Sequence, residues 1–238
     1  MELLVLTDEL QAQIEQDPTN VDWIKLSTYY QLSKALIKKY QNFVNWYCIS
    51  RCQKLSEDLI TAYKDLVEWE QVSSKQQLSE WFITQHQHQV NWYSVSEFQQ
   101  LSEQFIERHS HHVNWYLISA HQRLSEHFMD THSDKVNWSL VSRYQVLPET
   151  FILKHHAKLN WYYVCRHQVL SESFMTQNAN LIKWNVISQY QQLSENLILD
   201  NLARLDLDVI QDRYPQIYKK YGLWLYRALG KNSACTYT

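Results

Sequence analysis

The order of hydrophobic and polar residues along this chain repeats every 23 residues between residues 21 and 204. A fixed period of this length is typical of solenoids, in which each unit buries its apolar face only against its neighbours. No insertion separates the copies, which begin at Val21, Val44, Val67, Val90, Val113, Val136, Leu159 and Ile182. The pattern therefore predicts one elongated array and not several globular domains.

Two stretches of each copy, numbered here from 1 to 23, have the spacing of amphipathic helices. The first has apolar or small residues at positions 3, 6, 7 and 10, and the second has large apolar residues at positions 16 and 17. Asn or Asp precedes the first stretch in six copies, and Ser precedes the second in seven. Because these residue types cap helix starts, each copy is predicted to be a hairpin of two short helices.

The apolar positions also predict how the hairpins are held together. Position 3 is Trp in all eight copies, from Trp23 to Trp184, and position 7 is Ser or Cys. Helices of about two turns are marginal alone, so we expect the tryptophans to form the centre of a core between repeats. Burying one large apolar side chain contributes about 1.5–3 kcal/mol. Small residues at position 7 suit a close approach of neighbouring helices.

The predicted fold class is all-α: a right-handed or superhelical solenoid of eight two-helix repeats with a cap at each end. Residues 1–20 are predicted to form an N-terminal helical cap, and residues 21–204 the eight repeats. Residues 205–230 are predicted to be a degenerate repeat and a C-terminal helical cap, because Leu207 and Gln211 replace Trp and Ser and Pro215 follows. We expect residues 231–238 to be a frayed tail.

Composition excludes several classes of function. The chain has a formal net charge of −3 and only two glycines, so neither an overall basic field nor a glycine-rich phosphate loop is expected. It has no apolar run of membrane-spanning length, and its N-terminus lacks the features of a secretory signal. Four cysteines without a paired motif favour a reduced, intracellular chain, which we expect to be cytoplasmic and not membrane-bound.

Three positions of the repeat carry the same polar residue type in several copies, and we call each such set a column. The His, Gln and Glu columns could each have a chemical role. Position 20 is His in four successive copies: His86, His109, His132 and His155. Residues one repeat apart are separated by about 10 Å, so these histidines are too distant to share a metal ion. Tyrosines fill the same column in earlier copies, so we interpret it as a half-buried aromatic site. A metal contact among His88, His109, His111 and His112 is the alternative there. Neither a resident metal nor a cofactor is expected.

The Gln column at position 10 and the Glu column at position 14 also receive structural interpretations. We expect each Gln amide to satisfy backbone groups at the turn between helices, because buried polar groups need partners. The glutamates recur in equivalent surroundings at helix starts, where the helix dipole favours a negative charge. Acid–base catalysis needs carboxylates in different environments, and no nucleophile–base pair appears. The sequence therefore predicts that the chain is not an enzyme.

The outer face of the first helices is the candidate binding surface, because positions 4, 5, 8 and 9 vary between copies and positions 4, 8 and 9 are rich in Tyr, Arg and His. Tyr and Arg are favoured binding anchors, and Arg with aromatic rings can also stack nucleobases. The competing interpretation is that position 9 packs on the adjacent repeat and the arginines are solvated. The candidate residues are Tyr47, Arg51, Tyr93, Phe98, Tyr116, His121, Arg143, Tyr144, Tyr162, Arg166 and His167.

The consensus Val-Asn-Trp-Tyr-x-Ile-Ser-x-x-Gln-x-Leu-Ser-Glu-x-Phe-Ile resembles uncharacterised tandem 23-residue repeats in proteins of large DNA viruses and some phages. The resemblance covers residues 21–204, about 80% of the chain. It implies an α-helical repeat and a viral origin, and hence a place in the host cytoplasm. It transfers no catalytic residue.

These observations predict a non-enzymatic binding scaffold, since fixed core columns with variable surface columns suit recognition. The expected partner is a protein, and for a virus-encoded chain that partner would be a host factor. The alternative is a binder of single-stranded nucleic acid or nucleotides that uses the Tyr, Arg and His face of the first helices. The net charge of −3 counts against this alternative.

Overall fold

The computed structural model of the chain describes residues 3–228, with side chains described up to residue 221. Within these residues, nineteen α-helices and one 3-10 turn occur, and no β-strand is present apart from a single bridge between Leu4 and Tyr30. The helices form pairs that recur along the sequence. The prediction of an all-α helical-repeat fold is therefore confirmed.

The chain divides into two compact units, Met1–Gln122 and Arg123–Thr238, whose boundary follows helix α10. The first unit contains α1 (Asp8–Gln16), η1 (Pro18–Asn20), α2 (Trp23–Tyr29), α3 (Lys34–Lys39), α4 (Trp46–Cys52), α5 (Glu57–Ala62), α6 (Trp69–Lys75), α7 (Glu80–Gln85), α8 (Trp92–Phe98), α9 (Glu103–Arg108) and α10 (Trp115–His121). The second contains α11 (Glu126–Thr131), α12 (Trp138–Tyr144), α13 (Glu149–Lys154), α14 (Trp161–His167), α15 (Glu172–Gln177), α16 (Trp184–Tyr190), α17 (Glu195–Asp200), α18 (Leu207–Arg213) and α19 (Pro215–Ala228).

Each repeat contains a first helix at positions 3 to 9 and a second helix at positions 14 to 19. The expected residues cap both. The Asn91 side chain accepts a hydrogen bond from the Ser94 amide at 2.9 Å, and the Ser79 hydroxyl accepts one from the Phe82 amide at 3.1 Å. These bonds satisfy backbone donors that have no partner inside the helix. The predicted helix starts are thus confirmed.

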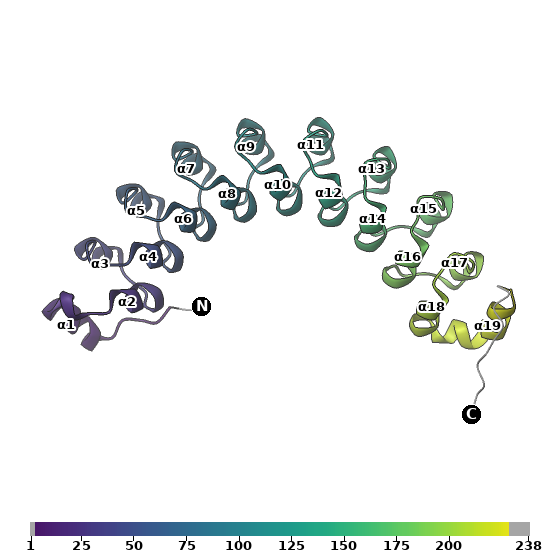
Figure 1. The fold of residues 1–238 in the computed structure, drawn as a ribbon, viewed down its shortest axis with the longest axis horizontal. Coiled ribbons are helices and arrows are strands. Elements are labelled where there is room, and N and C mark those ends of the chain that lie inside the picture. Colours follow the sequence, from purple (N-terminus) through teal and green to yellow (C-terminus); the bar gives the residue numbers. More distant parts are fainter. Residues whose placement is uncertain (1–2, 229–238) are drawn as a thin grey trace, which may run out of the picture. The chain divides into compact units, whose positions relative to one another are not determined.

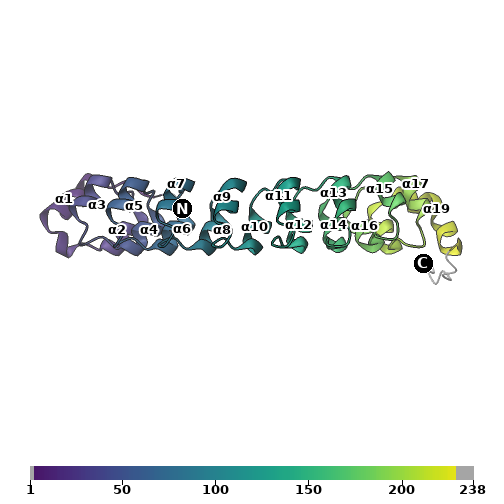
Figure 2. The same cartoon turned by 90° about the horizontal axis from the view of Figure 1, so that it is seen from above.

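In each unit, the first helices form one row and the second helices form another (Figure 1), and the two rows also separate in the view from above (Figure 2). The tightest contacts between repeats join neighbouring first helices, such as α6 with α8 and α12 with α14. Ser73 and Ser96, at position 7 of these helices, are fully buried. Because serine has a small side chain, it permits this close approach.

The Gln column links each repeat to the one before it. The Gln53 side-chain oxygen accepts a hydrogen bond from the Leu32 amide at 3.0 Å. Its nitrogen donates to the carbonyls of Ser27 and Tyr30 at 2.9 and 2.8 Å. The same three bonds recur at Gln76, Gln99 and Gln168. The predicted backbone role is confirmed, and the turn that is held belongs to the preceding repeat.

Two further columns make bonds in the opposite direction along the chain. The Ser50 hydroxyl accepts a hydrogen bond from the Glu68 amide at the start of the next first helix, at 3.0 Å. The Glu57 carboxylate accepts bonds from the Ser79 amide and hydroxyl, at 2.5 and 3.1 Å. Glu149 and Glu172 make the same pair of bonds in the second unit. The glutamates lie in the first helical turn, as expected, and also fasten the next repeat.

The tryptophans differ from the expectation of a central stack between repeats. Only Trp23 and Trp184 are buried among the eight, and the others are half-buried. The rings pack on their own second helix: the Trp92 ring lies 5.1 Å from that of His109. The indole nitrogen donates to a carbonyl five residues earlier, as from Trp92 to Gln87 at 2.9 Å. The indole needs this acceptor, so it stays at the edge, and the aliphatic side chains and methionines at positions 6 and 17 fill the core.

The N-terminal segment covers the first repeat. Helix α1 is capped by Thr7 and buries Ile14 completely against the core. Position 10 of the first repeat is Tyr30, so no amide is available there. Leu4 pairs with the chain instead: its amide donates to the Tyr29 carbonyl at 2.7 Å, and its carbonyl accepts from the Gln31 amide at 2.8 Å.

The C-terminal end reproduces the amide bonds with other side chains. Tyr214 stands at position 10, and its hydroxyl accepts from the Leu193 amide at 2.9 Å and donates to the Gln191 carbonyl at 3.3 Å. Arg213 donates to the Ser188 carbonyl. Helix α19 then runs from Pro215 to Ala228, within the predicted C-terminal helical cap. The predicted tail, 231–238, lies outside the described residues.

Candidate binding surface on the first helices

The candidate residues lie on the side of the first helices that faces away from the core. All eleven side chains are exposed: Tyr47, Arg51, Tyr93, Phe98, Tyr116, His121, Arg143, Tyr144, Tyr162, Arg166 and His167. Positions 6 and 7 point inward, so positions 4, 8 and 9 are left on the outer surface by the helical period. These side chains are therefore not part of the core of their own repeat.

In the second unit, the candidate residues of α12 and α14 meet in one continuous group of side chains. We call this group the arginine–tyrosine cluster. It comprises Arg143, Tyr144, Tyr162, Tyr163, Arg166, His167 and Tyr190. Five of these residues were predicted from the sequence. Tyr163 at position 5 and Tyr190 of α16 join them through ring contacts between neighbouring repeats.

Arg166 is held by two tyrosines from different repeats. Its Nη1 donates a hydrogen bond to the Tyr162 hydroxyl at 2.9 Å, and its guanidinium lies 4.5 Å from the centre of the Tyr190 ring. The hydrogen bond to Tyr162 raises the pKa of Arg166, which keeps the guanidinium charged. An arginine over an aromatic face is an orientation that leaves the edge of the guanidinium open to an acceptor.

Arg143 makes similar contacts one repeat earlier. Its guanidinium lies 4.9 Å from the Tyr144 ring centre and 5.5 Å from that of Tyr163. The Tyr163 ring also lies 5.9 Å from the His167 ring. Burial lowers the pKa of His167, and the nearby charges of Arg166 and Arg143 lower it further. The lowered pKa favours the neutral imidazole of His167, which contributes an aromatic surface to the cluster.

An exposed valine comes shortly after each of the helices α12 and α14 in the sequence. Val146 and Val169 occupy position 11 after α12 and α14, and their exposed fractions are 95% and 92%. Sequence reasoning missed these valines because position 11 is polar or charged in the other six repeats. The departure from that pattern is the signal that could have identified them. Exposed apolar residues beside aromatic ones are typical of protein-binding surfaces.

The candidates of the first unit are more dispersed. In α4 the Arg51 Nη1 donates to the Tyr47 hydroxyl at 3.5 Å, and Lys75 lies 5.4 Å from the Phe98 ring centre. Within the described part of this unit, no ring contact joins Tyr93, Tyr116 and His121 to one another. Among the described residues, the structure thus joins candidates of neighbouring repeats at α12 and α14, through the added rings of Tyr163 and Tyr190.

The histidine column forms aromatic contacts between helices of the same repeat. The His109 ring lies between Trp92 and Phe105, at centroid distances of 5.1 and 4.4 Å, and its Nε2 lies 3.2 Å from the Thr84 hydroxyl. Burial lowers the pKa of His109, with smaller contributions from His112 and Arg108. In residues 3–228, no three His, Cys, Asp or Glu side chains come together as metal ligands would.

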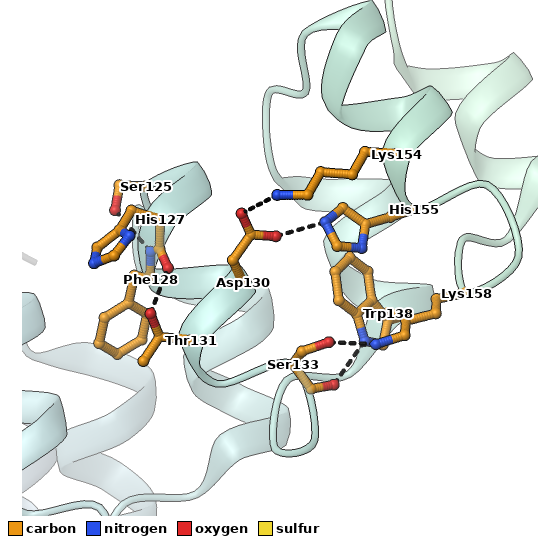
Figure 3. Close-up of polar contacts among 10 residues, drawn as sticks. All are labelled: Ser125, His127, Phe128, Asp130, Thr131, Ser133, Trp138, Lys154, His155 and Lys158. Carbon is orange, nitrogen blue, oxygen red and sulfur yellow. Dashed lines mark hydrogen bonds and ion pairs between the residues drawn. The ribbon is translucent and has the colours of Figure 1, made fainter.

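A polar cluster on the second helices of the second unit links α11 to α13 (Figure 3). The two Asp130 oxygens accept from Lys154 and from the His155 ring, each at 2.6 Å. Lys154 first, and then His155, lower the pKa of Asp130. Lys158 contacts the Ser133 hydroxyl and lies 5.3 Å from the centre of the Trp138 ring. These contacts join neighbouring repeats.

Two small cavities of the described residues lie between second helices. The larger one, of about 290 Å³, is lined by polar residues of α15 and α17, including Glu172 and Asp200. The other, of about 220 Å³, lies between α7 and α9 beside Trp81, which is 69% exposed and which the repeat pattern did not single out. No helix within residues 3–228 has the length and apolar character needed to cross a bilayer.

Comparison with protein-family models, curated proteins and solved structures finds no match to this chain. The resemblance to tandem repeats of viral proteins stays a prediction. Inferences about function therefore depend on the surface that the repeats present.

Proposed function

We propose that the chain is a non-enzymatic scaffold that binds a protein partner through the exposed face of its first helices. The observation that carries this proposal is the arginine–tyrosine cluster on α12, α14 and α16. Tyr and Arg supply most of the binding free energy at many protein interfaces. In a virus-encoded chain, the partner would be a host protein.

The repeat architecture supports this proposal. Side chains at positions 6, 7, 10 and 14 are committed to packing and to bonds between repeats, as Gln168 and Glu149 illustrate. Residues at positions 4, 8 and 9 are free to vary because they lie outside these contacts. A rigid backbone that carries variable side chains binds with a low entropic cost, because little has to be ordered on association.

Binding of single-stranded nucleic acid is the second candidate, and one observation favours it. Residues 123–238 contain thirteen Lys and Arg against ten Asp and Glu, a formal charge of +3, whereas residues 1–122 contain nine against fifteen, a charge of −6. The net charge of the whole chain hides this difference. Aromatic rings with arginine in a positively charged region are a platform on which bases stack.

The test is affinity capture by the full chain from cell extract, with protein and nucleic acid recovered together. A variant with Tyr144→Ala, Tyr162→Ala and Arg166→Ala removes the centre of the cluster. Its matched control, Thr150→Ala, Ser173→Ala and Asn196→Ala, changes exposed residues of second helices in three successive repeats. We expect the first variant alone to lose the captured protein. Equal capture by both variants, or capture of nucleic acid only, would contradict the proposal.

A further inference from the structure

We propose that the arginine–tyrosine cluster binds an extended acidic segment of its protein partner, whose carboxylates meet Arg143 and Arg166 on neighbouring repeats. The inference rests on the proposed function and specifies the chemistry of the partner. Three features of the second unit carry it: the missing ion-pair partners of both arginines, the rings that hold them, and the charge of the surrounding chain.

Neither arginine has a carboxylate partner among the described residues. The ion pairs found there use Lys39, Lys154, His155 and Lys220 as the cations. Helices α12, α14 and α16 contain no Asp or Glu. A guanidinium has five N–H donors, and Arg166 gives one of them to Tyr162. Both side chains therefore present charged donors that a carboxylate can accept in pairs.

The rings fix the guanidinium groups before a partner arrives. Arg166 is placed between Tyr162 and Tyr190, and Arg143 lies near Tyr144 and Tyr163. A long arginine side chain that is already oriented loses less conformational entropy when it binds. A solvated surface arginine would not need tyrosines from two repeats around it. The arrangement is that of a preorganised anion site.

The spacing of the arginines suits an extended peptide. They occupy position 8 of adjacent first helices, and packed helices lie about 8–10 Å apart. An extended chain in the polyproline II conformation has three residues per turn and advances about 3.1 Å per residue, so acidic residues three positions apart lie on one face and are separated by about 9 Å. Such a segment can cross α12 and α14 with one carboxylate at each guanidinium. Its intervening side chains would contact the tyrosine rings.

The small number of basic residues and the exposed valines favour a peptide over nucleic acid. The formal charge of +3 in residues 123–238 attracts an acidic chain over a distance set by the ionic strength. A nucleic-acid groove tracks the phosphates with a row of basic residues, but α12, α14 and α16 contain only the two arginines. The exposed Val146 and Val169 lie two residues beyond Tyr144 and His167, and they offer apolar contacts that a sugar–phosphate chain does not use.

The test is fluorescence anisotropy with the full chain and three labelled probes. The first is a synthetic peptide with Glu at every third residue and Leu and Tyr between, the second replaces each Glu by Gln, and the third is oligothymidylate. We expect the Glu peptide to bind about tenfold more tightly than the Gln peptide at low salt. Its affinity should fall as salt is added, because screening weakens exposed charge contacts.

Variants locate the site. Arg143→Ala with Arg166→Ala should weaken binding of the Glu peptide by about tenfold and leave the Gln peptide unchanged. The control pair, Lys158→Ala with Lys219→Ala, removes the same formal charge from exposed residues outside the cluster and should have no effect. Circular dichroism checks that every variant keeps its helices.

Four results would overturn the inference. They are no binding of the Glu peptide, equal binding of both peptides, equal losses in the arginine and lysine pairs, and tighter arginine-dependent binding of oligothymidylate. If both peptides bind equally and Tyr144→Ala with Tyr162→Ala weakens both, the proposed protein-binding function stands while the acidic partner is wrong. If neither peptide binds and the capture from extract does not depend on the cluster, both proposals fail.

Discussion

The side-chain amide of Gln76 donates a hydrogen bond to the main-chain carbonyl of Gln53, 23 residues earlier, at 2.8 Å. Gln99 makes the same bond to Gln76, again at 2.8 Å. The side chain of each glutamine donates to the preceding repeat, and its main-chain carbonyl accepts from the glutamine of the following repeat. The repeats are therefore joined by buried polar bonds as well as by apolar packing, and such bonds specify how one repeat is placed on another.

Gln76→Ala should destabilise the chain by about 3 kcal/mol, because it leaves buried backbone groups of Ser50, Gln53 and Leu55 without their side-chain partner. Urea denaturation followed by circular dichroism measures the change. The neighbouring Gln77→Ala is the control, since this side chain is exposed and should change stability by less than about 0.5 kcal/mol. Equal denaturation midpoints for the two variants would refute the structural role of the column.

Ser73→Leu should destabilise the chain by about 1–3 kcal/mol, since the residue is fully buried where α6 approaches α8 and added volume forces the helices apart. Its hydroxyl also accepts from the Asn91 amide at 2.9 Å, a bond that leucine cannot make. Thermal denaturation provides the measurement. Ser74→Leu, at the adjacent position 8, is the control and should be tolerated. Similar losses from both substitutions would show that the spacing of the first helices does not depend on position 7.

Tyr214→Phe should cost about 1–3 kcal/mol in the free energy of unfolding, because the buried Leu193 amide and Gln191 carbonyl lose the hydroxyl between them. Hydrogen exchange of the Leu193 amide should quicken as well. Tyr190→Phe removes an equivalent hydroxyl from an exposed ring and should leave both quantities unchanged. Unaltered exchange at Leu193 in the Tyr214 variant would show that the last repeat is closed without this bond.

His109 should make the first unit sensitive to acid. Burial lowers the pKa of His109 below its ordinary value of 6.5, so the unfolded chain takes up a proton at this residue before the folded chain does. The associated stability is present above pH 6.5 and is lost as the pH falls from there through the folded pKa. His109→Tyr places in this column the residue type that Tyr40 and Tyr63 already supply, and it should flatten this part of the pH profile.

Denaturation of both proteins between pH 7.5 and 5 tests the idea. NMR titration of the imidazole signals of the unmodified chain gives the pKa directly. A folded pKa of His109 at or above 6.5 would contradict the expected direction, as would parallel pH profiles for the two proteins.

The helical hairpins could be predicted because their signals are local. Asn91 and Ser79 each precede an apolar period and cap the helix that follows within three residues. The partners of the polar columns could not be predicted in the same way. Gln53 bonds to residues 21, 23 and 26 positions earlier, and nothing within one repeat shows whether its amide reaches backward, forward or into its own turn.

The candidate surface shows the same limit. The repeat pattern identified Arg143 and Arg166 as variable and outward-facing, since that follows from helical periodicity. It did not identify Tyr163 as the ring that joins Arg143 to His167, because this contact passes between repeats at position 5. Leu207 and Gln211 in place of Trp and Ser predict a degenerate repeat, although Tyr214 keeps the bonds of the glutamine that it replaces.

The constant sequence separation of these bonds has a consequence for how the gene can change length. Suppose that the codons for 23 consecutive residues are removed anywhere between residues 44 and 113. The side-chain amide of each remaining position-10 glutamine then faces a turn equivalent to the one that it bonded before. An excision one codon shorter would leave the glutamines opposite the wrong carbonyls. Whole-unit recombination is therefore the tolerated route by which such a chain grows or shrinks, and each event would add or remove one outward-facing strip of side chains.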